Sequence, residues 1–142
     1  MPALAGIVLA LLVALFARAV GFDRERSFYP VVLVVVASYY DLFAVMGGNS
    51  SELLAELIGF AVFAAAAVLG FRFNLWIVAG ALAGHGVFDF FHSSLLPGRG
   101  VPSFWPTFCM MYDVVAAGTL AALIVSGKLG AGRAIRNPDS VQ

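Results

Sequence analysis

The stretch Leu75–Leu96, LWIVAGALAGHGVFDFFHSSLL, decides the fold, because it is long enough to cross a bilayer and contains no Lys or Arg. A transmembrane α-helix needs about 20 predominantly apolar residues. Three ionisable side chains interrupt the stretch: His85, Asp89 and His92. Their i, i+4, i+7 spacing places all three on one stripe of a helix. Because an ionisable group is costly in lipid, we expect this stripe to face the interior of a helix bundle.

Composition and length indicate an integral membrane protein. The chain has 142 residues, of which 62% are hydrophobic and only 11% charged, whereas an ordinary soluble domain has about 25% charged residues. We therefore predict an all-α integral membrane bundle of five transmembrane helices over residues 1–132, followed by a polar cytoplasmic tail at 133–142. The five apolar stretches are Ala3–Val20, Tyr29–Met46, Leu53–Phe71, Leu75–Leu96 and Phe108–Gly127.

The basic residues indicate how this bundle is oriented. Under the five-helix arrangement Arg99 alone lies on one side of the membrane, and the other seven share the opposite side: Arg18, Arg24, Arg26, Arg72, Lys128, Arg133 and Arg136. Cytoplasmic loops carry an excess of basic residues. We therefore expect a multi-pass protein of the bacterial inner membrane, with its N-terminus outside and its C-terminus in the cytoplasm. The formal net charge is zero and no basic run occurs, which argues against nucleic acid as a partner.

Ionisable residues of four predicted helices gather in the outer half of the bilayer. With about 1.5 Å of rise per residue, the group comprises Asp41, Glu52, Glu56, His85, Asp89, His92 and Asp113. No Lys or Arg lies at this depth, so the carboxylates require bound cations, shared protons, protonated histidines or water. Histidine with carboxylate suits a divalent metal such as Zn²⁺, Mn²⁺ or Fe²⁺.

We predict specific roles for these residues. His85, Asp89 and His92 are the predicted metal ligands, and Asp113, Asp41 or Glu56 completes the coordination or acts as general base. The single cysteine, Cys109, excludes an intrachain disulfide, and we interpret it as a small buried hydrophobic residue.

Three functions stay open at this point. A metal-dependent enzyme, for example a hydrolase, would activate water on the ion and attack a lipid-like or small amphiphilic substrate drawn from the membrane lipid. A transporter or channel component would move protons or cations through the polar groups, with a homo-oligomer supplying a route between subunits. An accessory or assembly subunit would use the same groups only to join its helices.

Two further patterns concern packing. Gly80-x-x-x-Gly84 is a close-approach pattern, which predicts a neighbouring helix against that face. The connection Pro97–Pro106 is rich in proline and glycine, which disfavour helix, and its Trp105 suits the headgroup region. We therefore expect an irregular interfacial segment there.

The motifs also support a resemblance. The segments His85–His92 (HGVFDFFH), Val101–Pro106 (VPSFWP) and Phe108–Asp113 (FCMMYD) resemble a small bacterial family of integral membrane proteins whose function is uncharacterised. That resemblance covers about a third of the chain and implies no activity. In its combination of histidine and aspartate within helices, the stripe also resembles intramembrane metal hydrolases of the alkaline ceramidase type. Those enzymes combine several histidines, an aspartate and a serine over seven helices, whereas this chain has two histidines and five predicted helices.

Overall fold

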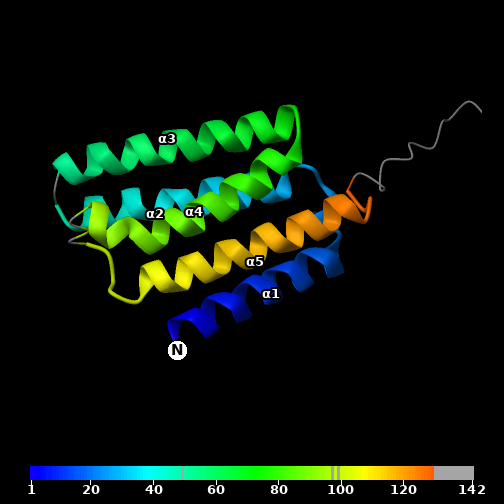
Figure 1. Cartoon of the computed structure of the whole chain (residues 1–142), viewed down its shortest axis with the longest axis horizontal. Helices are drawn as coiled ribbons and strands as arrows, with labels where there is room; N and C mark the ends of the chain where they lie inside the picture. The colour runs from blue at the N-terminus through cyan, green and yellow to red at the C-terminus, as the bar shows by residue number, and fades with distance from the viewer. Residues whose placement is uncertain (49, 97, 99, 130–142) are drawn as a thin grey trace, which may run out of the picture.

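The chain is all-helical, as a computed structural model shows for residues 1–48, 50–96, 98 and 100–129 (Figure 1). Its elements are α1 (Pro2–Val20), the 3₁₀ turn η1 (Phe22–Arg24), α2 (Phe28–Met46), α3 (Ser50–Arg72), α4 (Leu75–Leu95) and α5 (Trp105–Val125). All five α-helices are long and apolar enough to cross a membrane. The predicted all-α class and the five helices are therefore confirmed, whereas the predicted tail at 133–142 lies outside the described residues.

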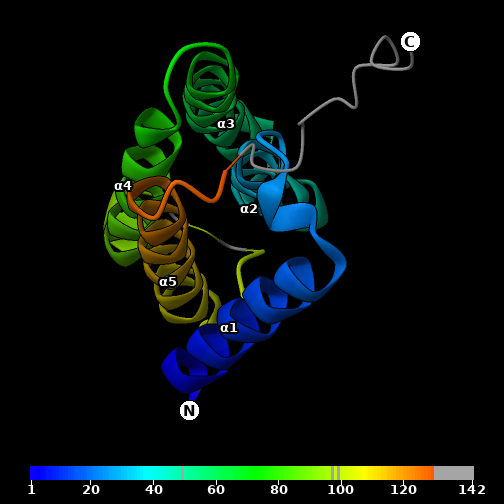
Figure 2. The ribbon, with the colours of Figure 1, turned by 90° about the vertical axis from the view of Figure 1, so that its right-hand side faces the viewer.

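The helices form an open ring and not a closed bundle. Around it they follow the order α1, α5, α4, α3, α2, and each packs against the next (Figure 2). The ring stays open between α1 and α2, which make no close backbone contact with each other in the part of the chain that the structure describes. This seam between α1 and α2 is lined on its inner side by α5.

The two ends of the bundle differ in charge. We call the end formed by the connections at 21–27, 73–74 and 126–129 the basic end, and the opposite end, with the connections at 47–49 and 96–104, the loop end. The basic residues described by the structure are all at the basic end: Arg18, Arg24, Arg26, Arg72 and Lys128. Arg26 Nε donates to the carbonyl oxygen of Phe71 at 2.7 Å, joining the connection at 21–27 to the last turn of α3. Which end faces the cytoplasm remains a prediction.

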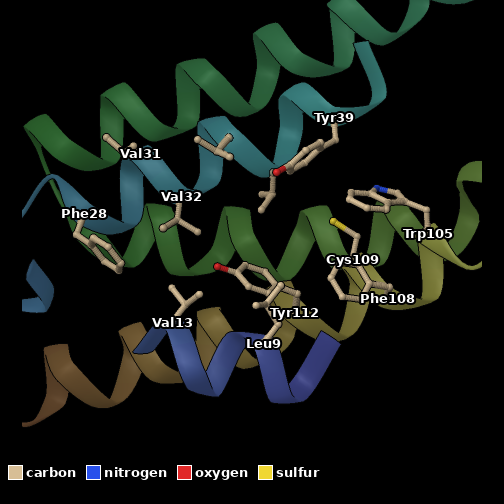
Figure 3. A pocket seen from close by; sticks show the side chains of 12 residues that line it. Leu9, Val13, Phe28, Val31, Val32, Tyr39, Trp105, Phe108, Cys109 and Tyr112 are labelled. Atoms are coloured by element: carbon tan, nitrogen blue, oxygen red, sulfur yellow. The ribbon is translucent and has the colours of Figure 1, made fainter. Parts of the chain in front are cut away.

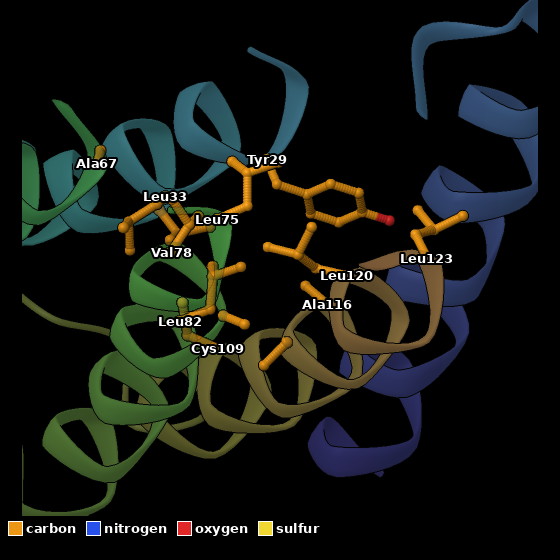
Figure 4. Packing of buried hydrophobic residues seen from close by; sticks show 13 residues of the cluster. Tyr29, Leu33, Ala67, Leu75, Val78, Leu82, Cys109, Ala116, Leu120 and Leu123 are labelled. Atoms are coloured by element: carbon orange, nitrogen blue, oxygen red, sulfur yellow. The ribbon is translucent and has the colours of Figure 1, made fainter. Parts of the chain in front are cut away.

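The core of the half toward the basic end is apolar. Leu33, Val78, Leu82 and Leu120 are fully buried there and converge from α2, α4 and α5 (Figure 4). The buried Asp, Glu and His residues of the five helices lie instead between the midpoint of the bundle and the loop end: Glu52, Glu56, His85, Asp89, His92 and Asp113. These groups therefore share one half of the bundle, as the sequence predicts for them.

Close approach between α4 and α5 occurs at Gly86. A Cβ atom at that position would lie 3.1 Å from the Met110 carbonyl oxygen, which is tighter than ordinary contact. Gly80 and Gly84 have open space around them, so the predicted close approach at Gly80-x-x-x-Gly84 is wrong. Gly80 and Gly84 lie on a different face of α4 from His85, so burying the His85 stripe leaves the two glycines facing outward.

Gly84 and Gly86 therefore offer a matched test of this packing. We expect Gly86→Leu to lower the melting temperature in detergent, because overpacking against α5 costs about 1–3 kcal/mol. Gly84→Leu is expected to be neutral or stabilising, since it adds helix propensity worth up to about 1 kcal/mol and meets no neighbour. Equal destabilisation by both substitutions would contradict the described contact between α4 and α5.

The start of α5 departs from the prediction of an irregular segment through Pro106. The helix begins at Trp105, with Pro106 in its first turn, where a proline sacrifices no intrahelical hydrogen bond. The Trp105 ring packs against the rings of Tyr39 and Phe43, each with a centroid separation of 5.0 Å. Trp105 therefore fixes the beginning of α5 against α2. Pro97 and Arg99, in the preceding connection, lie outside the described residues.

Candidate metal site

Two pairs of polar residues face each other across the contact between α4 and α5. His85 and Asp89 form an i, i+4 pair on α4, and Cys109 and Asp113 form an i, i+4 pair on α5. The small residue Gly86 lets the two helices approach beside them. Each of the four residues offers one ligand atom, and all four atoms lie within 4.8 Å of one another. We call these four residues the metal-ligand group.

The carboxylates of this group have more charge than the imidazole can compensate. His85 Nδ1 lies 2.6 Å from Asp113 Oδ2 and 3.5 Å from Asp89 Oδ2. Neither oxygen of Asp89 has a hydrogen-bond partner among the described residues, and the same holds for Asp113 Oδ1. All four side chains are at most 2% exposed. Buried carboxylates without hydrogen-bond partners are costly, and a bound cation or a shared proton would lower that cost.

The donor set determines which cations fit. One imidazole, two carboxylates and one thiol match the ligands of Zn²⁺ and related transition metals, while Mg²⁺ and Ca²⁺ prefer oxygen alone. In a tetrahedral zinc site two ligand atoms lie about 3.3–3.8 Å apart. Ligand atoms that lie within 4.8 Å of one another would therefore move inward by about 1 Å to bind the same ion. The described residues can therefore hold a single metal ion.

The structure brings together only part of the predicted site. His85, Asp89 and Asp113 meet, whereas His92 is not in the metal-ligand group. His92 lies two turns nearer the loop end, and its Nε2 pairs with Oε1 of Glu56 on α3 at 2.7 Å. Asp41, on α2, is partly exposed and also outside the group. The catalytic roles proposed for Asp113, Asp41 and Glu56 remain predictions.

Cys109 is the member that sequence reasoning missed. A single buried cysteine is usually a small hydrophobic residue, and nothing in the residue itself marks it as a ligand. The available signal was its spacing, because Cys109 precedes Asp113 by four residues just as His85 precedes Asp89. Two i, i+4 pairs on consecutive helices form one site when the helices pack along those faces.

The second histidine has a largely aromatic environment, and two of its rings, Tyr40 and Phe88, also contact His85. The Tyr40 ring stacks on His92 with centroids 3.9 Å apart and planes inclined by 14°, and Phe88 contacts His92 edge-on. Glu56 and His92 are both nearly fully buried, so their hydrogen bond is shielded from water. The Glu56–His92 pair therefore joins α3 to α4 through residues that are not in the metal-ligand group.

Two cavities approach the polar region from different directions. A cavity of about 330 Å³ at the loop end is lined by His92 together with the hydroxyl residues Ser93, Ser103 and Thr107. A cavity of about 370 Å³ between α1, α2 and α5 is largely apolar and includes Cys109 in its wall (Figure 3). The metal-ligand group thus borders the apolar cavity through its thiol.

Comparisons with protein-family models, curated proteins and solved structures gave no match for this chain. The resemblance to a small bacterial membrane family therefore stays a prediction. The fold and the site define a class instead: an all-helical chain with five helices able to span a membrane and a buried group of His, Asp and Cys able to hold a metal ion.

Proposed function

We propose that this chain is a membrane enzyme that binds one divalent transition metal ion and acts on a lipid-like substrate. The convergence of four ligand atoms within 4.8 Å in a fully buried position carries the proposal. Two ionised carboxylates contribute two negative charges, which a divalent ion neutralises. His85 then serves as a neutral ligand, and it no longer needs to be protonated to compensate Asp113.

The catalytic part of the proposal depends on where an exchangeable coordination position would lie. In the catalytic form that we propose, His85, Asp89 and Asp113 hold the ion and the Cys109 thiol is not bound to it, which gives the three protein ligands that catalytic zinc sites commonly use. The remaining position is then on the side of Cys109, which borders the apolar cavity. Water bound there would be acidified by the metal and would act as the nucleophile on an ester, amide or phosphoester of a lipid-like molecule.

The distribution of polar groups favours an enzyme over a transporter. Transport requires a route to both faces of the membrane, and the core of the half toward the basic end is built from apolar side chains (Figure 4). The loop-end cavity reaches His92 and not the metal-ligand group, whereas the apolar cavity borders that group at Cys109. A site approached from the apolar side suits chemistry on a membrane component. In this proposal the protein lies in the bacterial inner membrane with the loop end outside.

Metal analysis of protein purified in detergent tests this function. We expect about one zinc, manganese or iron ion per chain, and a loss of at least about tenfold in metal affinity for His85→Ala and for Asp113→Ala, because each removes a ligand. His92→Ala is the matched control, since it removes a buried histidine outside the metal-ligand group. This variant is expected to retain the ion.

Cobalt substitution then separates a catalytic site from a closed structural one. In the Co²⁺ protein we expect added azide to change the visible absorption spectrum, because a catalytic site keeps one exchangeable position. Wild-type protein that contains no transition metal and binds no Co²⁺ would overturn the metal proposal. Bound Co²⁺ that does not respond to azide would overturn its catalytic part.

A further inference from the structure

The apolar cavity beside Cys109 is elongated along α2. On α2 its wall runs from Phe28 to Tyr39 (Figure 3), which at 1.5 Å per residue is a length of about 17 Å. The volume of about 370 Å³ falls within the range of small-molecule sites, about 300–1,000 Å³. A narrow space of this length suits an extended chain better than a compact ring system.

The cavity lies where a lipid can enter it. It is enclosed by α1, α2 and α5, and the ring of helices is open between α1 and α2. Leu9 and Val13 of α1 face Val32 and Val35 of α2 across the space. Because hydrocarbon surrounds this seam in a bilayer, a chain can slide in from the side without crossing water.

Three of the cavity's polar groups, those of Tyr39, Trp105 and Cys109, lie toward the loop end, and Figure 3 shows the Tyr39 hydroxyl and the Cys109 sulfur directed into the cavity. The fourth, the Tyr112 hydroxyl, is directed toward Val13 and Val32. The indole nitrogen of Trp105 is buried without a hydrogen-bond partner among the described residues. This N–H can only donate, so a ligand that satisfies it must present an acceptor oxygen.

We propose that the cavity binds one long acyl chain, with its carbonyl group beside Trp105 and Cys109 and its tail extending toward Phe28. This inference rests on the proposed function in one respect, because it makes the acyl compound the substrate that meets the metal. The Trp105 N–H donates to the carbonyl oxygen. The reactive carbon is thereby held next to the metal-ligand group, while the apolar wall holds the chain.

Trp105 provides the probe for the test. The chain has two tryptophans, so Trp76→Phe leaves Trp105 as the sole tryptophan. This variant is reconstituted in phosphatidylcholine vesicles, and its tryptophan fluorescence is followed. Spin-labelled stearic acid and its methyl ester are the quenchers. We expect saturable quenching of Trp105 that unlabelled stearic acid reverses. The free acid and the ester distinguish a fatty-acid ligand from an esterified lipid.

Filling the cavity separates specific binding from contact with bulk lipid. In this background, Val32→Phe on α2 and Val13→Phe on α1 are each expected to weaken binding, which raises the half-saturating concentration of the quencher at least about tenfold. Val62→Phe, on the lipid-exposed face of α3, is the matched control and is expected to leave binding unchanged. Quenching that never saturates, or that is equal in all three variants, would overturn the proposal. Melting curves of the two filled variants verify that they fold.

Chelation makes the two proposals separable. The apolar wall binds the chain without the ion, so we expect saturable quenching to survive removal of the metal. Protein that binds metal but shows no saturable quenching would overturn the acyl-chain site alone. Protein that shows saturable quenching but never binds a metal would overturn the metal proposal alone.

Discussion

Asp89→Asn is expected to raise the melting temperature of the metal-free protein and to abolish its stabilisation by metal. Asp89 is completely buried, and neither of its carboxylate oxygens has a hydrogen-bond partner among the described residues. The nearby imidazole of His85 is already paired with Asp113 at 2.6 Å. One carboxylate therefore lacks compensation without an ion, and an isosteric amide removes that charge. We expect a gain of about 1–3 kcal/mol, which corresponds to several degrees.

The melting temperature of the metal-free protein is expected to change in the opposite direction when the other carboxylate, Asp113, is replaced. Asp113→Asn removes the acceptor that holds His85, and breaking a buried pair costs about 3–5 kcal/mol. Metal-free Asp113→Asn should therefore melt below the wild type, although both variants lose a metal ligand. Melting followed by circular dichroism in detergent, with chelator and then with excess Zn²⁺, measures both effects.

The zinc arm of this experiment tests the role of Asp89 in binding. A ligand at 100 times its dissociation constant stabilises the folded state by about 2.7 kcal/mol. The wild type should gain this increment, and Asp89→Asn should gain little or none of it. If Asp89→Asn lowers the melting temperature with chelator and responds to zinc like the wild type, then Asp89 is a structural residue and not a ligand.

The helices could be predicted from the sequence because apolar length alone determines them in a membrane. Their ends depend on local chemistry that hydropathy does not measure. Helix α3 begins at Ser50 and not at Leu53, since its first turn carries Glu52 and an acidic residue is favourable at a helix N-terminus. Helix α5 begins at Trp105 because Pro106 fits the first turn.

The candidate site could be predicted in part, because helical periodicity gives the face of a residue but not the neighbour it meets. His85, Asp89 and His92 do share one buried stripe of α4. His85 and His92 lie about 10 Å apart along the axis, and at these two heights the stripe meets different helices. His85 therefore contacts Asp113 of α5, whereas His92 contacts Glu56 of α3. Only the packing of α4 between α3 and α5 decides that division.

The Glu56–His92 pair leads to the second large effect, which a double-mutant cycle measures. We expect His92→Ala and Glu56→Ala each to destabilise the protein and the double variant to lose much less than the sum. The coupling energy should be about 1–3 kcal/mol, above the average of about 0.6 kcal/mol for hydrogen bonds between membrane helices. The reason is the 2.7 Å contact between two nearly fully buried groups, since either partner alone is left with an unsatisfied polar atom.

The control cycle pairs His92→Ala with Thr119→Ala. Thr119 lies in the basic-end half of α5 and bonds to its own helix at the Val115 carbonyl oxygen, so the two effects should add. Metal content should stay at the wild-type level in every variant of both cycles, because neither His92 nor Glu56 belongs to the metal-ligand group. Strong coupling with full metal content would show that α3 is joined to α4 by a contact separate from the metal centre. Loss of metal in Glu56→Ala would instead make the two histidines parts of one site.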